Sequence, residues 1–360
     1  MEIDASTGQT RIAIVTAERL YPCLTAHLAG IGGRSKSIPE DFVVEEIPAF
    51  ALTGQGSHLY LLVEKRDLSH EQMLRHIAKS LRIPRGDVGT AGMKDRRAVT
   101  RQFVSVPAAC EPLLPSLETD GLRVLSATRH PTKLKTGKLK GNRFSILLRD
   151  VPENAAELAE PIRERLLAVG FPNYFGSQRF GIDDETLSLG LRLLRGETQP
   201  RDLPGARRKF LLRLSLSSVQ SWLFNRCLAE RIEAGDAARI IPGDVLQVCA
   251  SGGLFVSEEP GIDQQRLDAG EVAVTGPMFG PKMKLPLGET HQREQAVLAQ
   301  SQLSLDAFAK FPKLTTGTRR PYLVRPESLE VREVADGLRF EFALPAGTYA
   351  TELLREFVKE

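Results

Sequence analysis

The stretch GMKDRR (residues 92–97) places one aspartate, Asp95, among three cations. Nearby positive charge favours the charged form of a carboxyl group. A charged carboxylate suits a nucleophile, whereas a general acid would need burial or a second carboxylate to keep its proton. We therefore interpret Asp95 as a candidate nucleophile. From the residues alone, a turn aspartate neutralised by its neighbours is an equally good interpretation.

Glycines and further cations surround this stretch. Gly89 and Gly92 would let the backbone approach a bulky ligand closely. Two basic clusters contain no acid other than Asp95: Lys94, Arg96, Arg97 and Arg101, and then Lys133, Lys135, Lys138, Lys140 and Arg143. Either cluster alone is more often a solvated face, but two of them with a glycine-bearing loop favour an anionic polymer as the partner.

Other chemistries find less support in the sequence. No G-x-x-x-x-G-K-[ST] motif occurs in this stretch and no G-x-G-x-x-G opens a helix there, which argues against a nucleoside triphosphate enzyme. A glycosidase pair of carboxylates, with the second from Glu45 or Glu46, stays open because sequence gives no distance to Asp95. The four cysteines and six histidines are scattered, so neither a disulfide framework nor a zinc site is predicted.

The length of 360 residues and an apolar fraction of 42% predict a globular chain of about two domains. No apolar run approaches the ~18 residues that cross a bilayer, and the N-terminus lacks a charged start followed by a hydrophobic stretch. We therefore expect no membrane association, no export and a location in the reducing cytoplasm.

The elements around Asp95 can be read from local patterns. Residues 57–66 and 99–106 are rich in β-branched and aromatic residues and predict strands. Between them, Ser69 and Gln72 have capping-box spacing ahead of an apolar helical face, and Pro84 ends the helix. Asp95 should then lie on an exposed connection leading into an extended segment.

The rest of the chain changes character twice. Residues 142–150 alternate as a strand, residues 153–235 are mainly helical, and strand alternation returns at 338–347 before a short terminal helix. The clearest helix carries capping-box spacing at Ser217 and Gln220. A Gly/Pro-rich stretch at 276–289 predicts a long loop. Sheet, then helix, then sheet suggests an inserted domain.

The segment AGMKDRRAVTRQ (91–102) resembles the catalytic motif of the TruD family of tRNA pseudouridine synthases. Five further segments resemble family segments in the family's order: PEDFVVEE (39–46), LKGNRF (139–144), PNYFGSQRFG (172–181), GDVLQV (243–248) and LPAGTYAT (344–351). The resemblance covers nearly the whole chain. It implies an α+β fold, with a mixed, mainly antiparallel pseudouridine-synthase sheet and an inserted second α+β domain. The implied boundaries are 1–169 and 321–360 for the catalytic domain and 170–320 for the insert.

By the same resemblance, Asp95 attacks the target nucleotide, and uridine in tRNA, expected at position 13, becomes its C-glycoside isomer without a cofactor or metal. The family likeness places Asn142 as a polar support for the base and Phe144 as the ring that stacks on it. Phe42 and Tyr349 match aromatic positions of the same pocket. From periodicity alone, core packing is the better interpretation of Phe144 and an equal one for Phe42 and Tyr349.

Three cations complete the expected site. Lys36 aligns with a family lysine that should pair with the catalytic aspartate, although a solvated surface lysine is an equal alternative. Lys94 and Arg96 flank Asp95 and are interpreted as substrate contacts. A monomer is the default expectation. The competing functions are a noncatalytic structured-RNA-binding protein or RNA chaperone, which would not need Asp95, and an RNA-directed glycosidase, which would release free uracil.

Overall fold

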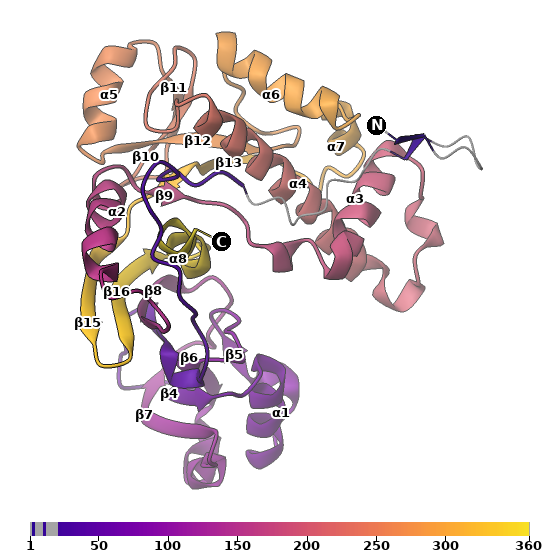
Figure 1. The fold of residues 1–360 in the computed structure, drawn as a ribbon. Helices are drawn as coiled ribbons and strands as arrows, with labels where there is room; N and C mark the ends of the chain where they lie inside the picture. Colours follow the sequence, from indigo (N-terminus) through magenta and orange to yellow (C-terminus); the bar gives the residue numbers. More distant parts are fainter. Residues whose placement is uncertain (1, 4–9, 12–20, 360) are drawn as a thin grey trace.

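The computed structural model describes residues 2–3, 10–11 and 21–359. Most of the N-terminal stretch in which we sought an export signal lies outside these residues. In the described part of the chain, no helix is long and apolar enough to cross a membrane. Figure 1 shows two lobes, each built on its own sheet, with helix α8 (Ala350–Val358) near their junction.

The larger sheet has eight strands in the order β15-β16-β8-β3-β6-β4-β7, with β5 paired to β6. Its strands are β3 (Phe42–Pro48), β4 (His58–Arg66), β5 (Gly89–Thr90), β6 (Val99–Pro107), β7 (Leu122–His130), β8 (Leu139–Leu148), β15 (Glu327–Val334) and β16 (Gly337–Pro345). Only β3 and β6 pair in parallel among these strands. The mainly antiparallel mixed sheet that the family likeness implied is therefore confirmed.

The second lobe contains a four-stranded sheet in the order β11-β10-β12-β13. Its strands are β10 (Val245–Val248), β11 (Leu254–Val256), β12 (Val272–Met278) and β13 (Thr318–Pro321). Two short pairs complete the strands: β1 (Glu2–Ile3) with β2 (Thr10–Arg11), and β9 (Phe171–Pro172) with β14 (Leu323–Val324). The β9–β14 pair joins the two points where we predicted the insert to begin and end, and those boundaries stay a prediction.

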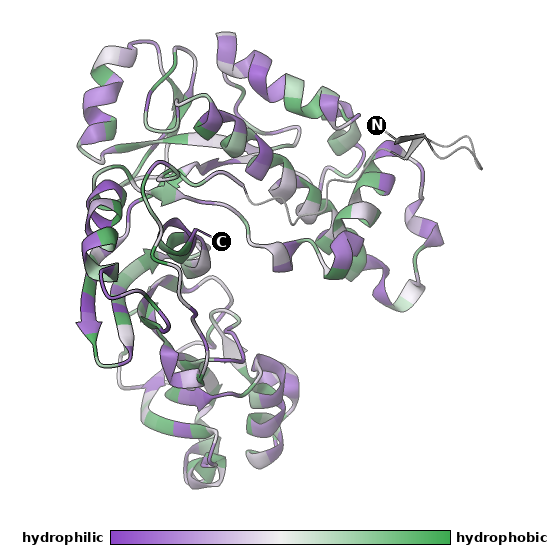
Figure 2. Cartoon of the chain, in the orientation of Figure 1, coloured by the Kyte–Doolittle hydropathy of each residue, from purple (hydrophilic) through white to green (hydrophobic). Residues whose placement is uncertain are grey.

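The helices differ between the lobes. Helices α1 (His70–Ser80), α2 (Ala155–Val169) and α8 accompany the large sheet, while the second lobe holds α3 (Glu185–Arg195), α4 (Arg208–Glu233), α5 (Pro260–Asp268), α6 (Gly288–Gln300) and α7 (Leu305–Ala309). Bands of hydrophobic and hydrophilic residues run along α4 in Figure 2, as expected of a helix with one buried face. The buried residues of α4 pack into one core with those of α3 and β12.

Helix α1 forms for the predicted reason. The Ser69 hydroxyl accepts a hydrogen bond from the Gln72 amide at 3.2 Å, and the Gln72 side chain accepts one from the Ser69 amide at 3.1 Å. Met73, Leu74 and Ile77 are buried against the sheet. The predicted strands at 57–66, 99–106, 142–150 and 338–347 are likewise present as β4, β6, β8 and β16.

Two local predictions are wrong. Helix α4 begins at Arg208, nine residues before the expected cap, and the Ser217 hydroxyl bonds to the Leu214 carbonyl at 3.0 Å inside the helix. Gly89 lies in β5, where a Cβ would come within 2.4 Å of the Leu134 carbonyl oxygen. It permits close strand packing, not the approach of a ligand.

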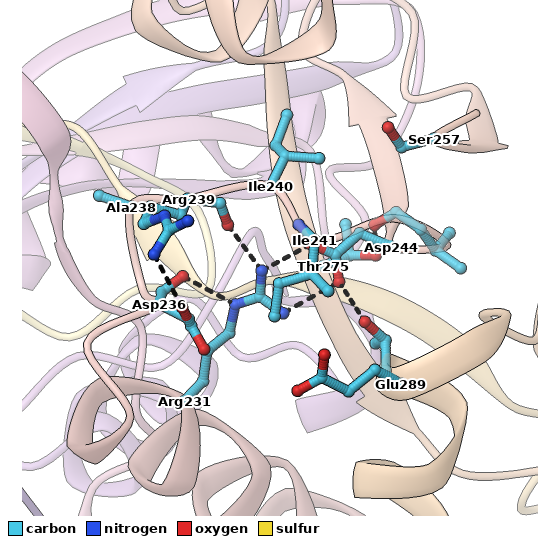
Figure 3. Close-up of polar contacts among 12 residues, drawn as sticks. Arg231, Asp236, Ala238, Arg239, Ile240, Ile241, Asp244, Ser257, Thr275 and Glu289 are labelled. Carbon is cyan, nitrogen blue, oxygen red and sulfur yellow. Dashed lines mark hydrogen bonds and ion pairs between the residues drawn. The ribbon is translucent and has the colours of Figure 1, made fainter. Parts of the chain in front are cut away.

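A buried polar network secures the second lobe (Figure 3). Asp244 accepts hydrogen bonds from the Arg231 guanidinium at 2.9 and 2.5 Å and from the Ile241 amide at 2.9 Å. The Thr290 hydroxyl donates a further bond at 2.8 Å. Since both charged groups are buried and every contact is direct, the GDVLQV segment acts here as structural support.

Candidate active site

Asp95 lies on the connection between β5 and β6, and 46% of its side chain is exposed. Its carboxylate accepts a hydrogen bond from the Lys36 ammonium at 2.7 Å, across 59 residues of sequence. The predicted exposed position of Asp95 and its predicted pairing with Lys36 are both confirmed. A carboxylate held in a direct ion pair and open to solvent is ready to act as a nucleophile.

Lys36 is held in an unusual backbone conformation, with φ of 60°. A lysine rarely adopts this left-handed region, and such strain persists only where surrounding structure imposes it. Its ammonium lies 4.1 Å from the centre of the Phe42 ring as well as against Asp95. The ring and the carboxylate thus fix one cation between them, which places Phe42 beside the candidate nucleophile.

Lys65 supports the loop from the buried side and was not singled out from the sequence. Its ammonium is fully buried and donates to the backbone oxygens of Asp95 at 2.5 Å and Leu68 at 2.8 Å. Burial lowers the pKa of Lys65 to about 8, and the charge of Asp95 opposes this shift. The periodicity of β4 carried a signal, because Lys65 has the same parity as buried Leu61 and Val63.

Lys94 does not face solvent as the basic cluster suggested. Its ammonium lies 2.7 Å from a carboxylate oxygen of Glu46, and both side chains are buried. The other oxygen of Glu46 accepts a hydrogen bond from the Phe103 amide at 2.9 Å. Because this pair holds Lys94 inside the protein, the structure gives it a role in anchoring the loop and no free charge for an RNA phosphate.

The remaining cations of the first cluster point in different directions. Arg96 is exposed and lies 3.5 Å from Asp67. Arg101 lies on the face of the large sheet opposite to the one that carries Glu46, and it is 2.9 Å from Glu64. Arg97 is exposed and forms no ion pair with any residue that the structure describes. Among these four cations, Arg97 is therefore the one most available to an anionic ligand, although nothing in the sequence was a reason to select it from the cluster.

The register of the large sheet brings together the side chains that the family likeness selected. Asn142 of β8 pairs with Glu46 of β3, and Phe144 pairs with Val44 two residues along. All four lie on the face that carries Phe42. The side-chain oxygen of Asn142 is buried and has no hydrogen-bond partner among the described residues. A buried acceptor without a donor is costly, so this atom is a candidate contact for a ligand.

Phe144 belongs to the core that packs against the large sheet. Only 6% of the residue is exposed, and its ring stacks on Phe342 with centroids 5.3 Å apart. Phe42 meets the same ring edge to face at 6.2 Å. The core-packing interpretation of Phe144 is therefore confirmed for this structure. Its role in stacking on a base stays a prediction and would require the ring to expose one face.

Tyr349 enters the site region from the C-terminal segment. Leu344 of β16 pairs with Asn142, and the amide of Ala346 donates to the Lys140 carbonyl at 3.1 Å, so the loop up to Tyr349 starts beside β8. The half-buried Tyr349 ring lies 6.3 Å from that of Phe175. Tyr349 thus lies where the second lobe meets the large sheet.

The opposite face of the sheet holds a depression of about 370 Å³ lined by polar residues, among them Glu45, Arg101 and Arg143. Glu45 lies 3.6 Å from each of these arginines. Because neighbouring residues of a strand face opposite sides, Glu45 is directed away from the face with Phe42 and Glu46. Neither glutamate is a free second carboxylate beside Asp95, so the site does not support the glycosidase pair. In the described part of the chain, no cluster of three or more His, Cys, Asp or Glu side chains is placed to hold a metal ion.

Comparison with known proteins gives a consistent result. The family model described as tRNA pseudouridine synthase D (TruD) matches residues 21–202 and 198–357. The chain is 42% identical over 338 residues to tRNA pseudouridine synthase D of Anaeromyxobacter dehalogenans, covering 94% of this chain and 96% of that protein. It is also 42% identical over 340 residues to the Thermus thermophilus protein of the same name, covering 94% and 92%. The crystal structure of a putative tRNA pseudouridine synthase D from Methanosarcina mazei superposes with a TM-score of 0.76 at 26% identity, covering 93% and 95%.

Proposed function

The chain belongs to the TruD family of tRNA pseudouridine synthases, and we propose from this premise that it isomerises uridine in tRNA with Asp95 as the nucleophile. The observation that carries the proposal is the exposed Asp95 carboxylate, paired with Lys36 at 2.7 Å beside the Phe42 ring. A purely binding protein has no need for this carboxylate among groups that would meet phosphates, and nothing in the comparisons favours a noncatalytic relative.

In the proposed reaction, Asp95 attacks the target nucleotide and the bond between N1 of uracil and C1′ of the ribose breaks. The uracil turns within the pocket and its C5 joins C1′. The bond between Asp95 and the nucleotide breaks before the product leaves, which restores the free carboxylate. C5 loses a proton and N1 gains one, so the composition of the nucleotide does not change. Lys36 orients the Asp95 carboxylate for the attack, while Lys65 holds the backbone of the same residue.

Base recognition in this proposal rests on Asn142. Its buried side-chain oxygen has no donor among the described residues, and the N3–H of uracil is a donor that would satisfy it. Uracil must leave the RNA stack to reach such a position, which costs a few kcal/mol and is least costly where the base is unpaired. Phe42, Phe144 and Tyr349 would supply apolar walls for the extruded base.

The direct test maps pseudouridine in an unmodified tRNA transcript incubated with the purified protein alone. We expect one uridine, at position 13 from the family likeness, to become pseudouridine in the absence of any added cofactor. No free uracil should appear, because the base never leaves the site. An RNA that is bound but unchanged would favour the noncatalytic alternative, and released uracil would favour the glycosidase.

The lysine-rich run gives a second test, refined by the structure. Lys133 donates to the Gly86 carbonyl and is partly covered, whereas Lys135, Lys138 and Lys140 are exposed. Replacing these three by Gln should weaken binding to all substrate tRNAs about equally and reduce the slope of log affinity against log salt by ~0.7 to 0.9 per lost contact. The rate at saturating tRNA should change little, because phosphate contacts position RNA without reading bases. An unchanged slope would assign the run to a solvated face.

Three details of the proposal go beyond what the comparisons show. These are position 13 as the target, a cytoplasmic location and a monomeric state. A tRNA substrate and four cysteines without C-x-x-C spacing support the location. Mapping the modified position in each tRNA and measuring the mass of the protein in solution would test the other two.

A further inference from the structure

Two arginines converge on one aromatic ring where the insert meets the catalytic sheet. The guanidinium carbon of Arg320 lies 4.2 Å from the centre of the Phe175 ring, and that of Arg179 lies 5.9 Å from the same centre. Arg179 follows β9 and Arg320 lies in β13, so the two residues are 141 positions apart in sequence. The positive charge of Arg179 acts to lower the pKa of Arg320, so the two like charges disfavour each other unless an anion joins them.

Neither arginine has a carboxylate partner in the part of the chain that the structure describes. Arg179 donates to the Ser221 hydroxyl at 3.3 Å. The adjacent Arg319 provides a contrast, because it lies 2.7 Å from Glu294 in a fully buried ion pair. Glu352, whose carboxylate lies near Gly176, is paired with Arg355 at 3.2 Å. Among the described residues, the two cations therefore have no carboxylate as a counter-ion.

Arg320 is nevertheless held firmly by neutral acceptors. Its guanidinium donates to the side-chain and backbone oxygens of Asn173 and, at 2.9 Å, to the backbone oxygen of Gly347. One terminal nitrogen of the guanidinium, Nη1, has no partner among the described residues. Burial lowers the pKa of Arg320 to about 10, with Arg179 contributing in the same direction and Tyr349 opposing it. A cation that is positioned, poorly hydrated and not neutralised is suited to bind an anion.

The location indicates which anion. Gly347 lies two residues before Tyr349, whose ring approaches Phe175, and the same loop begins beside Asn142. We propose that Arg179 and Arg320 form a phosphate-binding site for the RNA backbone within one nucleotide of the target uridine. The proposal rests on the function proposed above. Both arginines lie in the predicted insert, and Arg320 is bonded to Gly347 of the catalytic part, so this contact would hold the RNA backbone beside the catalytic sheet.

The test removes the charge from each partner in turn. The protein variants are Arg179→Gln and Arg320→Gln, with Arg239→Gln as a matched control because that arginine is exposed elsewhere on the insert. The RNA variants carry one uncharged methylphosphonate linkage on the 5′ or the 3′ side of the target uridine. A 2′-deoxy sugar stabilises that linkage, and the same 2′-deoxy RNA with an ordinary phosphate serves as the reference. Binding and single-turnover pseudouridine formation are measured for every combination.

We expect each arginine variant to lose about 10- to 100-fold in affinity or in kcat/KM on the ordinary RNA, as for one hydrogen bond to a charged group. On one of the two RNAs with a neutral linkage, the wild type should lose a similar factor in affinity or kcat/KM. On that same RNA, the arginine variants should be only slightly weaker than the wild type. Arg239→Gln should behave as the wild type on both. Such non-additivity would show that the arginines and that phosphate act together.

Other outcomes would overturn the proposal. In the first, neither neutral linkage changes the affinity or kcat/KM of the wild type. In the second, the losses from the protein change and the RNA change multiply when the two are combined. In the third, the arginine variants bind and react as Arg239→Gln does. Arg320→Gln could lower stability by freeing the Gly347 loop, so melting temperatures are compared and Arg179→Gln decides the matter if Arg320→Gln does not fold. Absence of pseudouridine with wild type and ordinary RNA would instead reject the proposed function.

Discussion

Asp95→Asn is expected to abolish pseudouridine formation while leaving tRNA binding intact. The substitution keeps the shape of the side chain and removes the charge on which covalent attack depends. Removal of a nucleophile commonly costs about 10⁴-fold or more in turnover. Binding should persist or tighten slightly, because a negative charge facing RNA is lost and Lys36 is freed from its partner. Single-turnover kinetics and a binding titration on the same tRNA measure both effects.

Asp87→Asn is the matched control, because Asp87 is an exposed aspartate in the segment that leads to the same loop. It makes the same change of charge and should retain turnover. Substantial pseudouridine formation by Asp95→Asn would contradict the nucleophile assignment. Equal loss of turnover in both variants would indicate a general effect of charge on RNA docking.

Among the proposed substitutions, Asp244→Ala is expected to lower the free energy of unfolding the most. Asp244 is fully buried and compensates the buried Arg231 through two hydrogen bonds. Breaking such a pair by removing one partner leaves an uncompensated buried charge and costs about 3 to 5 kcal/mol. The Ile241 amide and the Thr290 hydroxyl would lose an acceptor as well. Denaturant unfolding followed through Trp222, which lies in α4, reports on this lobe.

Glu289→Gln provides the comparison. Glu289 also pairs with an arginine, Arg293 at 2.5 Å, but on a largely exposed part of α6. An exposed pair contributes about 0 to 1 kcal/mol, so this variant should unfold almost as the wild type does. If Asp244→Ala unfolded as Glu289→Gln does, the network would not be the support that we infer for the second lobe.

Local patterns in the sequence were sufficient for several features of the site. The capping box at Ser69 and Gln72, the strand that follows Asp95 and the exposure of Asp95 itself all depend on residues close in sequence. Local propensity and alternation encode such features because each involves only neighbouring residues and the choice of a buried face. The same spacing misled at Ser217, since a serine with a glutamine three residues later also occurs inside a helix.

The family likeness supplied what local patterns could not, namely the pairing of Lys36 with Asp95 and the grouping of Asn142 with aromatic residues. Periodicity alone favoured core packing for Phe144, and its burial against Phe342 agrees with that interpretation. The likeness did not predict that Lys94 would be buried with Glu46. Neighbouring positions in sequence therefore did not establish which cations face the ligand.

By itself, then, the sequence determined the family, the exposed carboxylate and most strands, because motifs and alternation are local. Only the tertiary structure decided the partners of each charge. The one parallel pairing, of β3 with β6, brings Glu46 near Lys94 and Phe103, while β4 beside β6 places Lys65 under Asp95. Strand order and register fix these contacts across tens of residues, and a shift of one residue would turn every side chain to the other face. The same long-range packing sets Arg179 and Arg320 around Phe175, a charge arrangement that no local pattern encodes.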